Sequence, residues 1–208
     1  MRESFLNQEF EEKNPKELEV EEKSQNKSIL LAVFDFIKTT IVVVFLAFVI
    51  RLFVIQPFIV EGQSMLPLFA NNDYLITEKI SYELRSPKRG EIVIFHPPDN
   101  PSINYIKRII GLPGDKIEIK EGEVYVNNQK INEKYLAQNE PTKALTQDLV
   151  VQLKDNEFFV LGDNRNHSRD SREIGPIPRN NIVARVWLRL FPLNNISAFA
   201  AVNYNLSD

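Results

Sequence analysis

The chain has 208 residues, of which 43% are hydrophobic, and its formal net charge at pH 7 is −3. This length allows one domain with its own core together with appended segments. The lack of cysteine excludes disulfides, thiolate catalysis and thiolate metal ligands, and without a dominant basic patch no nucleic acid is expected as a partner.

The first 28 residues differ in composition from the rest of the chain. They carry eight glutamates and five basic side chains, with few apolar residues and no regular spacing between those. Such a segment cannot bury enough apolar surface to offset the entropy lost on ordering. We therefore expect residues 1–28 to form a disordered acidic tail.

An apolar stretch follows the tail and predicts a transmembrane helix over residues 29–55. Its longest run without a charge has 12 residues, Thr39–Ile50, whereas a span needs about 20 apolar residues. Lys38 and Arg51 lie towards the two ends of this stretch, where long side chains can reach the headgroups. A buried core helix fits the same pattern, so that alternative stays open.

The flanks of the apolar stretch bear on its orientation. A cleavable signal peptide fits less well, because its charged leader should be short and no small-x-small cleavage site follows the stretch. More lysines lie on the tail side than on the other side. The positive-inside rule therefore predicts a single pass through a lipid bilayer, with a cytoplasmic N-terminus and an exported body.

The residue pattern changes after the apolar stretch, and the new pattern predicts a mainly β, antiparallel body over residues 56–208. Short runs rich in Ile, Val, Tyr and Phe alternate with Gly, Pro, Asn and Asp, a pattern typical of strands. Tight turns are expected at Glu121-Gly122 and Asn127-Asn128, and a type II turn at Leu112–Asp115. The predicted strands are Tyr74–Lys79, Glu91–Phe95, Tyr105–Ile110, Lys116–Lys120, Glu123–Val126, Asp148–Leu153, Glu157–Leu161 and Ile182–Leu190.

Three polar segments stand out against this β background, namely Glu61–Pro67, Asn104–Asp115 and Gly162–Arg172. A serine hydroxyl such as that of Ser64 is a poor nucleophile unless a neighbouring base takes its proton. A lysine can be that base when burial keeps its amine neutral. Lys107 lies in a predicted strand rich in isoleucine, which suits this requirement.

The strand period places neighbours of Lys107 on defined faces. Residues two apart share a face, so Tyr105 points the same way as Lys107 and Arg108 points to the opposite face. A tyrosine ring beside the amine would help to exclude water. Taken alone, Lys107 fits an exposed edge strand equally well, and Ser64 in Gly62-Gln63-Ser64 fits an ordinary loop and lacks the second glycine of a nucleophile elbow.

The three segments taken together resemble the bacterial type I signal peptidases (leader peptidases), a family with a Ser/Lys dyad. Its Ser-Met-x-Pro segment is matched by Ser64–Pro67, just after the apolar stretch. Its Tyr-x-Lys-Arg-x-x-Gly-x-Pro-Gly-Asp segment is matched by Tyr105–Asp115, and its Gly-Asp-Asn-Arg-x-x-Ser-x-Asp-Ser-Arg segment by Gly162–Arg172. The likeness runs in family order over about residues 30–195, and three multi-residue matches are far more specific than one short motif.

The resemblance implies a membrane-bound serine endopeptidase that removes signal peptides from exported preproteins, with a signal-peptidase-like β fold. It implies Ser64 as nucleophile, Lys107 as general base and the Ser64 backbone N–H as oxyanion donor, without metal or cofactor. The family uses lysine where relatives of the endoplasmic reticulum have histidine, so a bacterial plasma membrane, or an internal membrane such as the thylakoid, is implied. The supporting residues it implies are Ser168, Tyr105, Met65, Asp170, Arg172 and Arg108.

Specific roles follow for several of these residues. Ser168 is expected to hydrogen-bond the Lys107 amine, Asp170 and Arg172 to form a bracing bidentate pair, and Met65 to line the cleft. One departure concerns the oxyanion hole, because the family often has a hydroxyl side chain two residues before the nucleophile. That position is Gly62 here, so one possible donor is missing, and losing such a donor can reduce the rate by about 10²-fold or more.

Other interpretations of the same residues remain open. Ser64, His167 and either Asp163 or Asp170 could form a Ser-His-Asp triad. Asp163, His167 and Asp170 could bind a metal, although these residue types in such a loop more often form turns and salt bridges. A self-cleaving repressor of the Ser/Lys type would carry a DNA-binding domain in place of the apolar stretch, and a degenerate membrane-anchored binding module would not need all of Ser64, Lys107 and Ser168.

Overall fold

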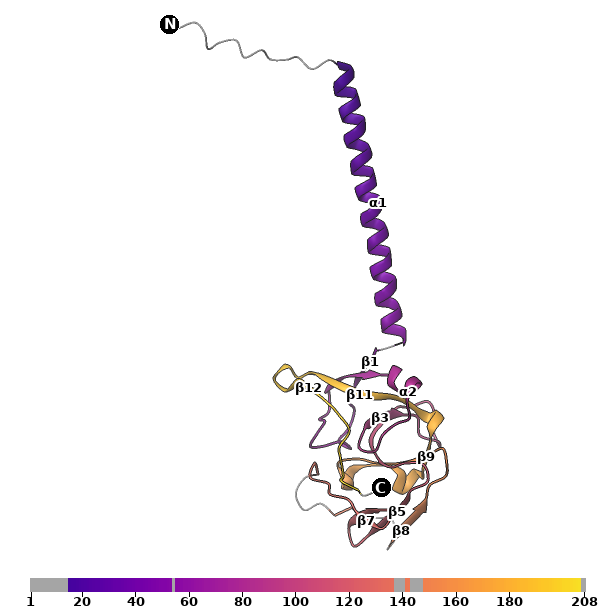
Figure 1. Ribbon diagram of the computed structural model, residues 1–208. Coiled ribbons are helices and arrows are strands. Elements are labelled where there is room, and N and C mark those ends of the chain that lie inside the picture. Colours follow the sequence, from indigo (N-terminus) through magenta and orange to yellow (C-terminus); the bar gives the residue numbers. More distant parts are fainter. Residues whose placement is uncertain (1–14, 54, 137–140, 143–147, 207–208) are drawn as a thin grey trace. The chain divides into compact units, whose positions relative to one another are not determined.

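The computed structural model describes residues 15–53, 55–136, 141–142 and 148–206, with side chains described at 27–48 and from residue 56 onward within these ranges. The contacts between residues divide the chain into two units, Met1–Val49 and Ile50–Asp208. Each unit is described by itself. The first unit contains most of one helix, and the second contains the strands (Figure 1).

Helix α1 runs from Pro15 to Phe53. Within it, the segment Lys27–Phe48 has a mean hydropathy of 2.4 and none of its residues is buried. A core helix would be covered by other elements, so this exposed apolar helix fits a single-pass membrane anchor instead. The predicted anchor is thereby supported over the part of the helix whose side chains are described.

The ends of α1 differ from the expected boundaries. Residues 15–28 belong to this helix, since proline is well tolerated in a first helical turn and the following Glu and Lys residues are good helix formers. Residues 1–14 of the expected tail lie outside the described part. The helix ends at Phe53, four residues before Pro57, whose ring would clash with the carbonyl of residue 53 in a continuing helix. Strand β1 (Ile55–Ile59) begins at Ile55, the last residue of the expected span.

One curled antiparallel sheet forms most of the second unit. Its strands follow the order β1-β2-β11-β3-β4-β9-β10, with the short β12 also paired to β11 (Figure 1). All the pairs within it are antiparallel, as the sequence predicts. The bounds of the further strands are β2 (Tyr74–Glu78), β3 (Ile92–Phe95), β4 (Tyr105–Gly111), β9 (Glu157–Leu161), β10 (Ile177–Pro178), β11 (Ile182–Phe191) and β12 (Ser197–Ala198).

A second, smaller sheet has the order β7-β6-β5-β8. It comprises β5 (Lys116–Lys120), β6 (Glu123–Val126), β7 (Gln129–Lys130) and β8 (Leu149–Gln152). The turns at Glu121-Gly122 and Asn127-Asn128 have positive φ at both residues, which suits two-residue hairpins. The turn at Leu112–Asp115 has Gly114 at φ +84° and a 3.0 Å hydrogen bond from the Asp115 N–H to the Leu112 carbonyl, as a type II turn requires.

Short helical turns complete the described part of this unit. They are α2 (Ile80–Leu84), α3 (Ser171–Ile174), η1 (Arg165–His167), η2 (Arg179–Asn181) and η3 (Leu193–Asn195). All eight predicted strands are present, and no end differs from the predicted one by more than one residue. The prediction of a mainly β, antiparallel body is therefore confirmed.

Three apolar clusters hold the body together. One lies between the two sheets and includes Ile117, Phe159 and the C-terminal Tyr204. The other two involve alternate residues of β3, since Val93 and Phe95 belong to one cluster while Ile92 and Ile94 belong to the other. The alternation follows from the period of two in a strand. Strand β3, which pairs with β4, is therefore packed against an apolar cluster on each face.

Candidate active site

Ser64 lies on the turn that follows β1, and this turn is fixed by contacts on two sides. Beneath it, Met65 is only 1% exposed and packs with Phe69 and other members of the third cluster. From the other side, the Asn164 N–H donates to the Ser64 carbonyl (3.0 Å) and the Asn164 Nδ2 donates to the Gln63 carbonyl (3.1 Å). The backbone at Ser64 is therefore held by the segment Gly162–Arg172.

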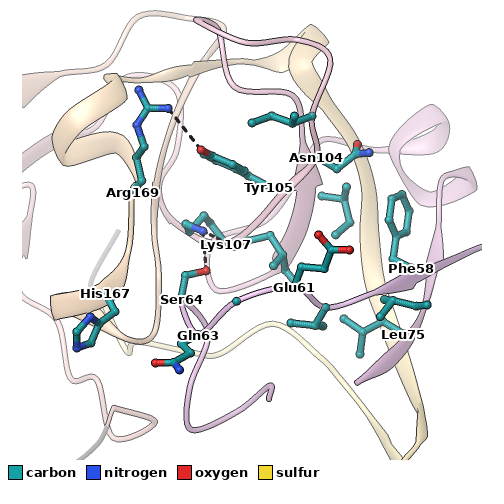
Figure 2. A pocket seen from close by; sticks show the side chains of 16 residues that line it. Phe58, Glu61, Gln63, Ser64, Leu75, Asn104, Tyr105, Lys107, His167 and Arg169 are labelled. Atoms are coloured by element: carbon teal, nitrogen blue, oxygen red, sulfur yellow. Dashed lines mark hydrogen bonds between the residues drawn. The ribbon is translucent and has the colours of Figure 1, made fainter. Parts of the chain in front are cut away.

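Lys107 reaches Ser64 from the middle of β4. Its Nζ lies 2.8 Å from the Ser64 Oγ and also donates to the Ile106 carbonyl at 2.9 Å. Figure 2 shows the two side chains facing one another, with the Tyr105 ring beside the amine at 5.1 Å from Nζ. Tyr105 shares its face with Lys107, as the strand period predicts.

Burial alters the acid–base behaviour of this amine. Lys107 is 3% exposed, and desolvation lowers its pKa from 10.5 to about 8. The negative charges of Asp170 and Asp163 oppose this change, whereas the positive charge of Arg172 adds to it. A substantial share of the amine is therefore neutral near pH 8 and can accept a proton from a hydroxyl at hydrogen-bond distance.

Arg108 points to the other side of β4 and pairs with Asp163. Its Nε and Nη2 donate to the two Asp163 carboxylate oxygens at 2.9 and 2.6 Å, and both side chains are at most 2% exposed. A third donor of Arg108, Nη1, reaches the Gly90 carbonyl at 3.1 Å. The guanidinium provides the buried Asp163 carboxylate with an opposite charge and two hydrogen bonds.

Asp170 is fully buried and accepts hydrogen bonds from several groups around the site. Arg172 donates through Nε and Nη2, each at 2.8 Å, in the bidentate geometry expected for this pair. The Gly162 N–H and the Ser168 hydroxyl also donate to it, at 3.0 and 2.7 Å. This carboxylate therefore joins both ends of the Gly162–Arg172 segment.

Two of the supporting residues take positions different from those expected. The Ser168 hydroxyl donates to Asp170, and among the described residues no hydrogen bond joins it to Lys107. Ser168 nevertheless packs near the reacting groups, since a Cβ built on Gly162 would lie 2.2 Å from the Ser168 Oγ and 2.6 Å from the Ser64 carbonyl oxygen. Met65 does not line the cleft, because its side chain points into the core beneath the turn.

A cleft of about 520 Å³ opens in front of the Ser64–Lys107 pair. Its walls come from the end of β1 with the following turn, from β2 and β3, and from the start of β4. Arg169 borders it on one side through a 3.4 Å contact with the Tyr105 hydroxyl (Figure 2). The lining is Phe58, Ile59, Val60, Glu61, Gly62, Gln63, Ser64, Leu75, Ile94, Ile103, Asn104, Tyr105, Ile106, Lys107, His167 and Arg169.

The histidine interpretation finds no support in this geometry. His167 lines the cleft, but Figure 2 shows its ring directed away from Ser64. Within the described ranges no hydrogen bond links His167 to Ser64, Asp163 or Asp170. Both carboxylates of the supposed triad or metal site are instead engaged by arginines, and no group of three or more metal-ligating side chains gathers among the residues described.

Asn164 is a functional residue that the sequence analysis missed, although it lies inside the third segment. Its place in that segment could have indicated a role, because an asparagine can hydrogen-bond backbone groups through both its amide and its side chain. What the sequence could not supply was the partner, since Asn164 and Gln63 lie 101 residues apart.

Comparison with known proteins decides the family. The family model described as signal peptidase, peptidase S26, matches residues 33–191, which include the turn that carries Ser64, strand β4 and the Gly162–Arg172 segment. The chain belongs to this family. It is therefore a serine peptidase.

Curated relatives of the family cover most of this chain. A probable signal peptidase I-2 from Synechocystis sp. is 42% identical over 76% of this chain and 73% of its own length. A signal peptidase I from Leptolyngbya laminosa is 42% identical over 77% of this chain and 80% of its own, and one from Bacillus licheniformis is 38% identical over 85% and 97%. The resemblance expected from the three segments is thus confirmed.

Proposed function

We propose that this chain removes signal peptides from exported preproteins through an acyl-enzyme, with Ser64 as nucleophile and Lys107 as general base. The observation that carries the proposal is the 2.8 Å contact between the Lys107 Nζ and the Ser64 Oγ at a cleft, with the lysine pKa lowered to about 8 by burial. Family membership supports the reaction class, and this contact supports the assignment of its residues.

The proton has a short path in this mechanism. Neutral Lys107 takes the Ser64 hydroxyl proton as the oxygen attacks the carbonyl carbon of the residue before the cut. The resulting ammonium returns the proton to the leaving amine, and a water activated by the same amine then hydrolyses the ester. The Tyr105 ring and the burial of Lys107 limit competing protonation by solvent.

The Ser64 backbone N–H is the proposed oxyanion donor. Among the residues described, none accepts a hydrogen bond from it, so it is available to a developing negative charge. Gly62 offers no hydroxyl, and its own N–H donates to the Asn71 side chain at 2.9 Å. The site therefore depends more strongly on the fixed orientation of the Ser64 peptide than a site with a second donor would.

The cleft suits an extended preprotein segment with small residues. Its apolar lining, which includes Phe58, Leu75 and Ile94, lies beside the exposed backbone of residues 61–64. A substrate strand can pair with such an edge, while shallow apolar pockets accept alternate side chains. We propose small residues, typically alanine, at the first and third positions before the cut.

The proposed organisation places this chemistry at a membrane surface. Residues 1–28 are proposed as the cytoplasmic segment, residues 29–55 as the anchor and residues 56–208 as the extracytoplasmic catalytic domain. The excess of lysine before the apolar helix supports this orientation. The membrane would be the plasma membrane of a bacterium or an internal membrane such as the thylakoid.

Processing of a preprotein by the purified full-length chain tests the proposal. Ser64→Ala should abolish cleavage, and Lys107→Met, which keeps the apolar stem, should lower kcat by about 10²–10⁴-fold. His167→Ala should keep kcat, because its ring does not reach Ser64. Full cleavage by Lys107→Met, or loss of cleavage in a folded His167→Ala protein, would contradict the dyad and favour the triad.

A further inference from the structure

Arg165 lies behind the site and is almost completely buried, with its side chain 1% exposed. A guanidinium has five N–H donors, and each of them has an acceptor here. Only one, the Nε contact to the Gly162 carbonyl at 3.0 Å, stays within the Gly162–Arg172 segment. The other four donors reach the side chains of Glu133 (both oxygens, 2.8 Å from Nη1 to Oε2), Thr142 and Tyr135.

Tyr204, near the C-terminus, joins the group of side chains around Arg165. The hydroxyls of Tyr135 and Tyr204 lie 3.0 Å apart, and the Tyr135 hydroxyl donates to the Glu133 Oε1 at 2.6 Å. Because that proton is committed to Glu133, Tyr204 is the donor to Tyr135. A directed chain of hydrogen bonds therefore runs from Tyr204 through Tyr135 to Glu133, which holds Arg165.

Arg165 in turn fixes the residue that holds the nucleophile turn. Asn164 precedes it directly and binds the carbonyls of both Ser64 and Gln63. The Arg165 carbonyl also accepts from the Arg172 Nη2 at 2.7 Å, which ties it to the Asp170 pair. Any movement of Arg165 would therefore be transmitted to the Ser64 peptide, whose N–H is the proposed oxyanion donor.

From these contacts we infer that Glu133 and Tyr204 are positioning residues for the cleavage reaction, acting through Arg165 and Asn164 on the Ser64 backbone. The inference rests on the proposed function of Ser64. It assigns a role in catalysis to the segment that follows β7 and to the chain's last described residues, neither of which lines the cleft. Within the described part of the chain, the side-chain contacts of Glu133 run to Arg165 and Tyr135 and not to Lys107, so its proposed influence is on geometry.

The test compares two carboxylates in the same part of the body. Glu133→Gln removes the charge that pairs with Arg165, and Glu123→Gln removes a carboxylate whose exposed partner is Lys130. Each full-length variant is assayed for kcat and KM on a preprotein, with thermal unfolding measured in parallel. Glu133→Gln should lower kcat about tenfold to hundredfold with KM unchanged, because small misplacements of reacting groups have effects of this size, whereas Glu123→Gln should match the wild type.

A double-mutant cycle separates positioning from general loss of stability. If Glu133 acts through Asn164, the kcat effect of Glu133→Gln should shrink to about twofold or less in an Asn164→Ala background, since coupled sites are not additive. Equal kcat for Glu133→Gln and the wild type, or a fully multiplicative double variant, would overturn the inference. Failure of the proposed function is distinct, because Ser64→Ala would then cleave as the wild type does.

Tyr204→Phe provides a milder variant in case Glu133→Gln does not fold. It keeps the packing of the ring and removes only the hydroxyl that donates to Tyr135. A two- to tenfold lower kcat with the pH dependence of the wild type is expected, because Lys107 is untouched. An unchanged kcat in Tyr204→Phe would remove Tyr204 from the inference.

Discussion

The amine of Lys107 lies 2.8 Å from the hydroxyl of Ser64, although 43 residues separate them in the chain. The two residues belong to different elements, a turn after β1 and the middle of β4. Their contact depends on the curl of the large sheet, on the apolar cluster that contains Met65 and on the hydrogen bond from Asn164 to the Ser64 backbone. The proposed catalysis therefore depends on packing as much as on the two side chains.

The pH dependence of cleavage follows from the buried amine. Only neutral Lys107 can take the proton, and its pKa is lowered to about 8. On the acid side kcat/KM should fall about tenfold per pH unit below that pKa, because each unit lowers the neutral fraction tenfold. A steady-state profile on a peptide substrate measures this, and a profile flat to pH 5 would contradict a neutral-lysine base.

Arg172 should set the position of that acid limb. Its positive charge lowers the pKa of Lys107, so its loss raises that pKa and moves the limb to higher pH. Arg172→Gln should therefore shift the limb towards alkaline pH, while Arg172→Lys, which keeps the charge, should shift it less. Arg172→Gln should also lower the free energy of unfolding by about 3–5 kcal/mol, since it leaves the buried Asp170 without its main partner.

The outcome for Arg172 can be checked by pH profiles and denaturant unfolding of the same three proteins. An acid limb that moves towards lower pH in Arg172→Gln would contradict the electrostatic account. Equal limbs in all three proteins would show that Arg172 acts only through structure.

Gly162 should tolerate no side chain. A Cβ there would lie 2.2 Å from the Ser168 Oγ, 2.5 Å from the Ser168 Cβ and 2.6 Å from the Ser64 carbonyl oxygen. Gly162→Ala should therefore displace the Ser64 backbone and lower kcat by about 10²-fold. The loss should appear in the kcat of the folded protein, which kinetics combined with circular dichroism can establish.

Gly111→Ala is the matched control for that substitution. Its Cβ would be crowded too, but by Leu153, Ile117 and Phe159 in the cluster between the sheets. It should lower the free energy of unfolding by about 1–3 kcal/mol through overpacking, with kcat of the folded protein near that of the wild type. Equal loss of kcat in both variants would mean that crowding acts on the fold and not on Ser64.

Much of the fold is predictable from the sequence because strands and turns have local signals. Alternating apolar residues and turn residues such as Asn127-Asn128 predict the eight main strands. The two-residue strands and β1 carry too little local pattern to be predicted as strands, and the first residue of β1, Ile55, falls within the span predicted as helix. At residues 15–28 composition alone does not separate a helix from a polar tail, because Glu and Lys are common in both.

The site, like the fold, has features with a local signal in the sequence and features without one. Ser64, Lys107 and the Asp170–Arg172 pair lie in motif segments, so a resemblance can indicate them. The partner of the Ser168 hydroxyl and the burial of Met65 depend on three-dimensional packing, and both differed from expectation. Glu133 and Tyr204 have no local signal at all, because their relation to Arg165 exists only in the folded chain.

The proposed mechanism requires that Ser64 is acylated and that Lys107 makes this possible. The most direct measurement is intact-mass and peptide-level mass spectrometry of the enzyme quenched in acid during turnover of a peptide ester. We expect one acyl adduct, located on the peptide that contains Ser64, and no adduct in Lys107→Met within the same time. Turnover without any adduct on Ser64, or undiminished acylation in Lys107→Met, would contradict the mechanism.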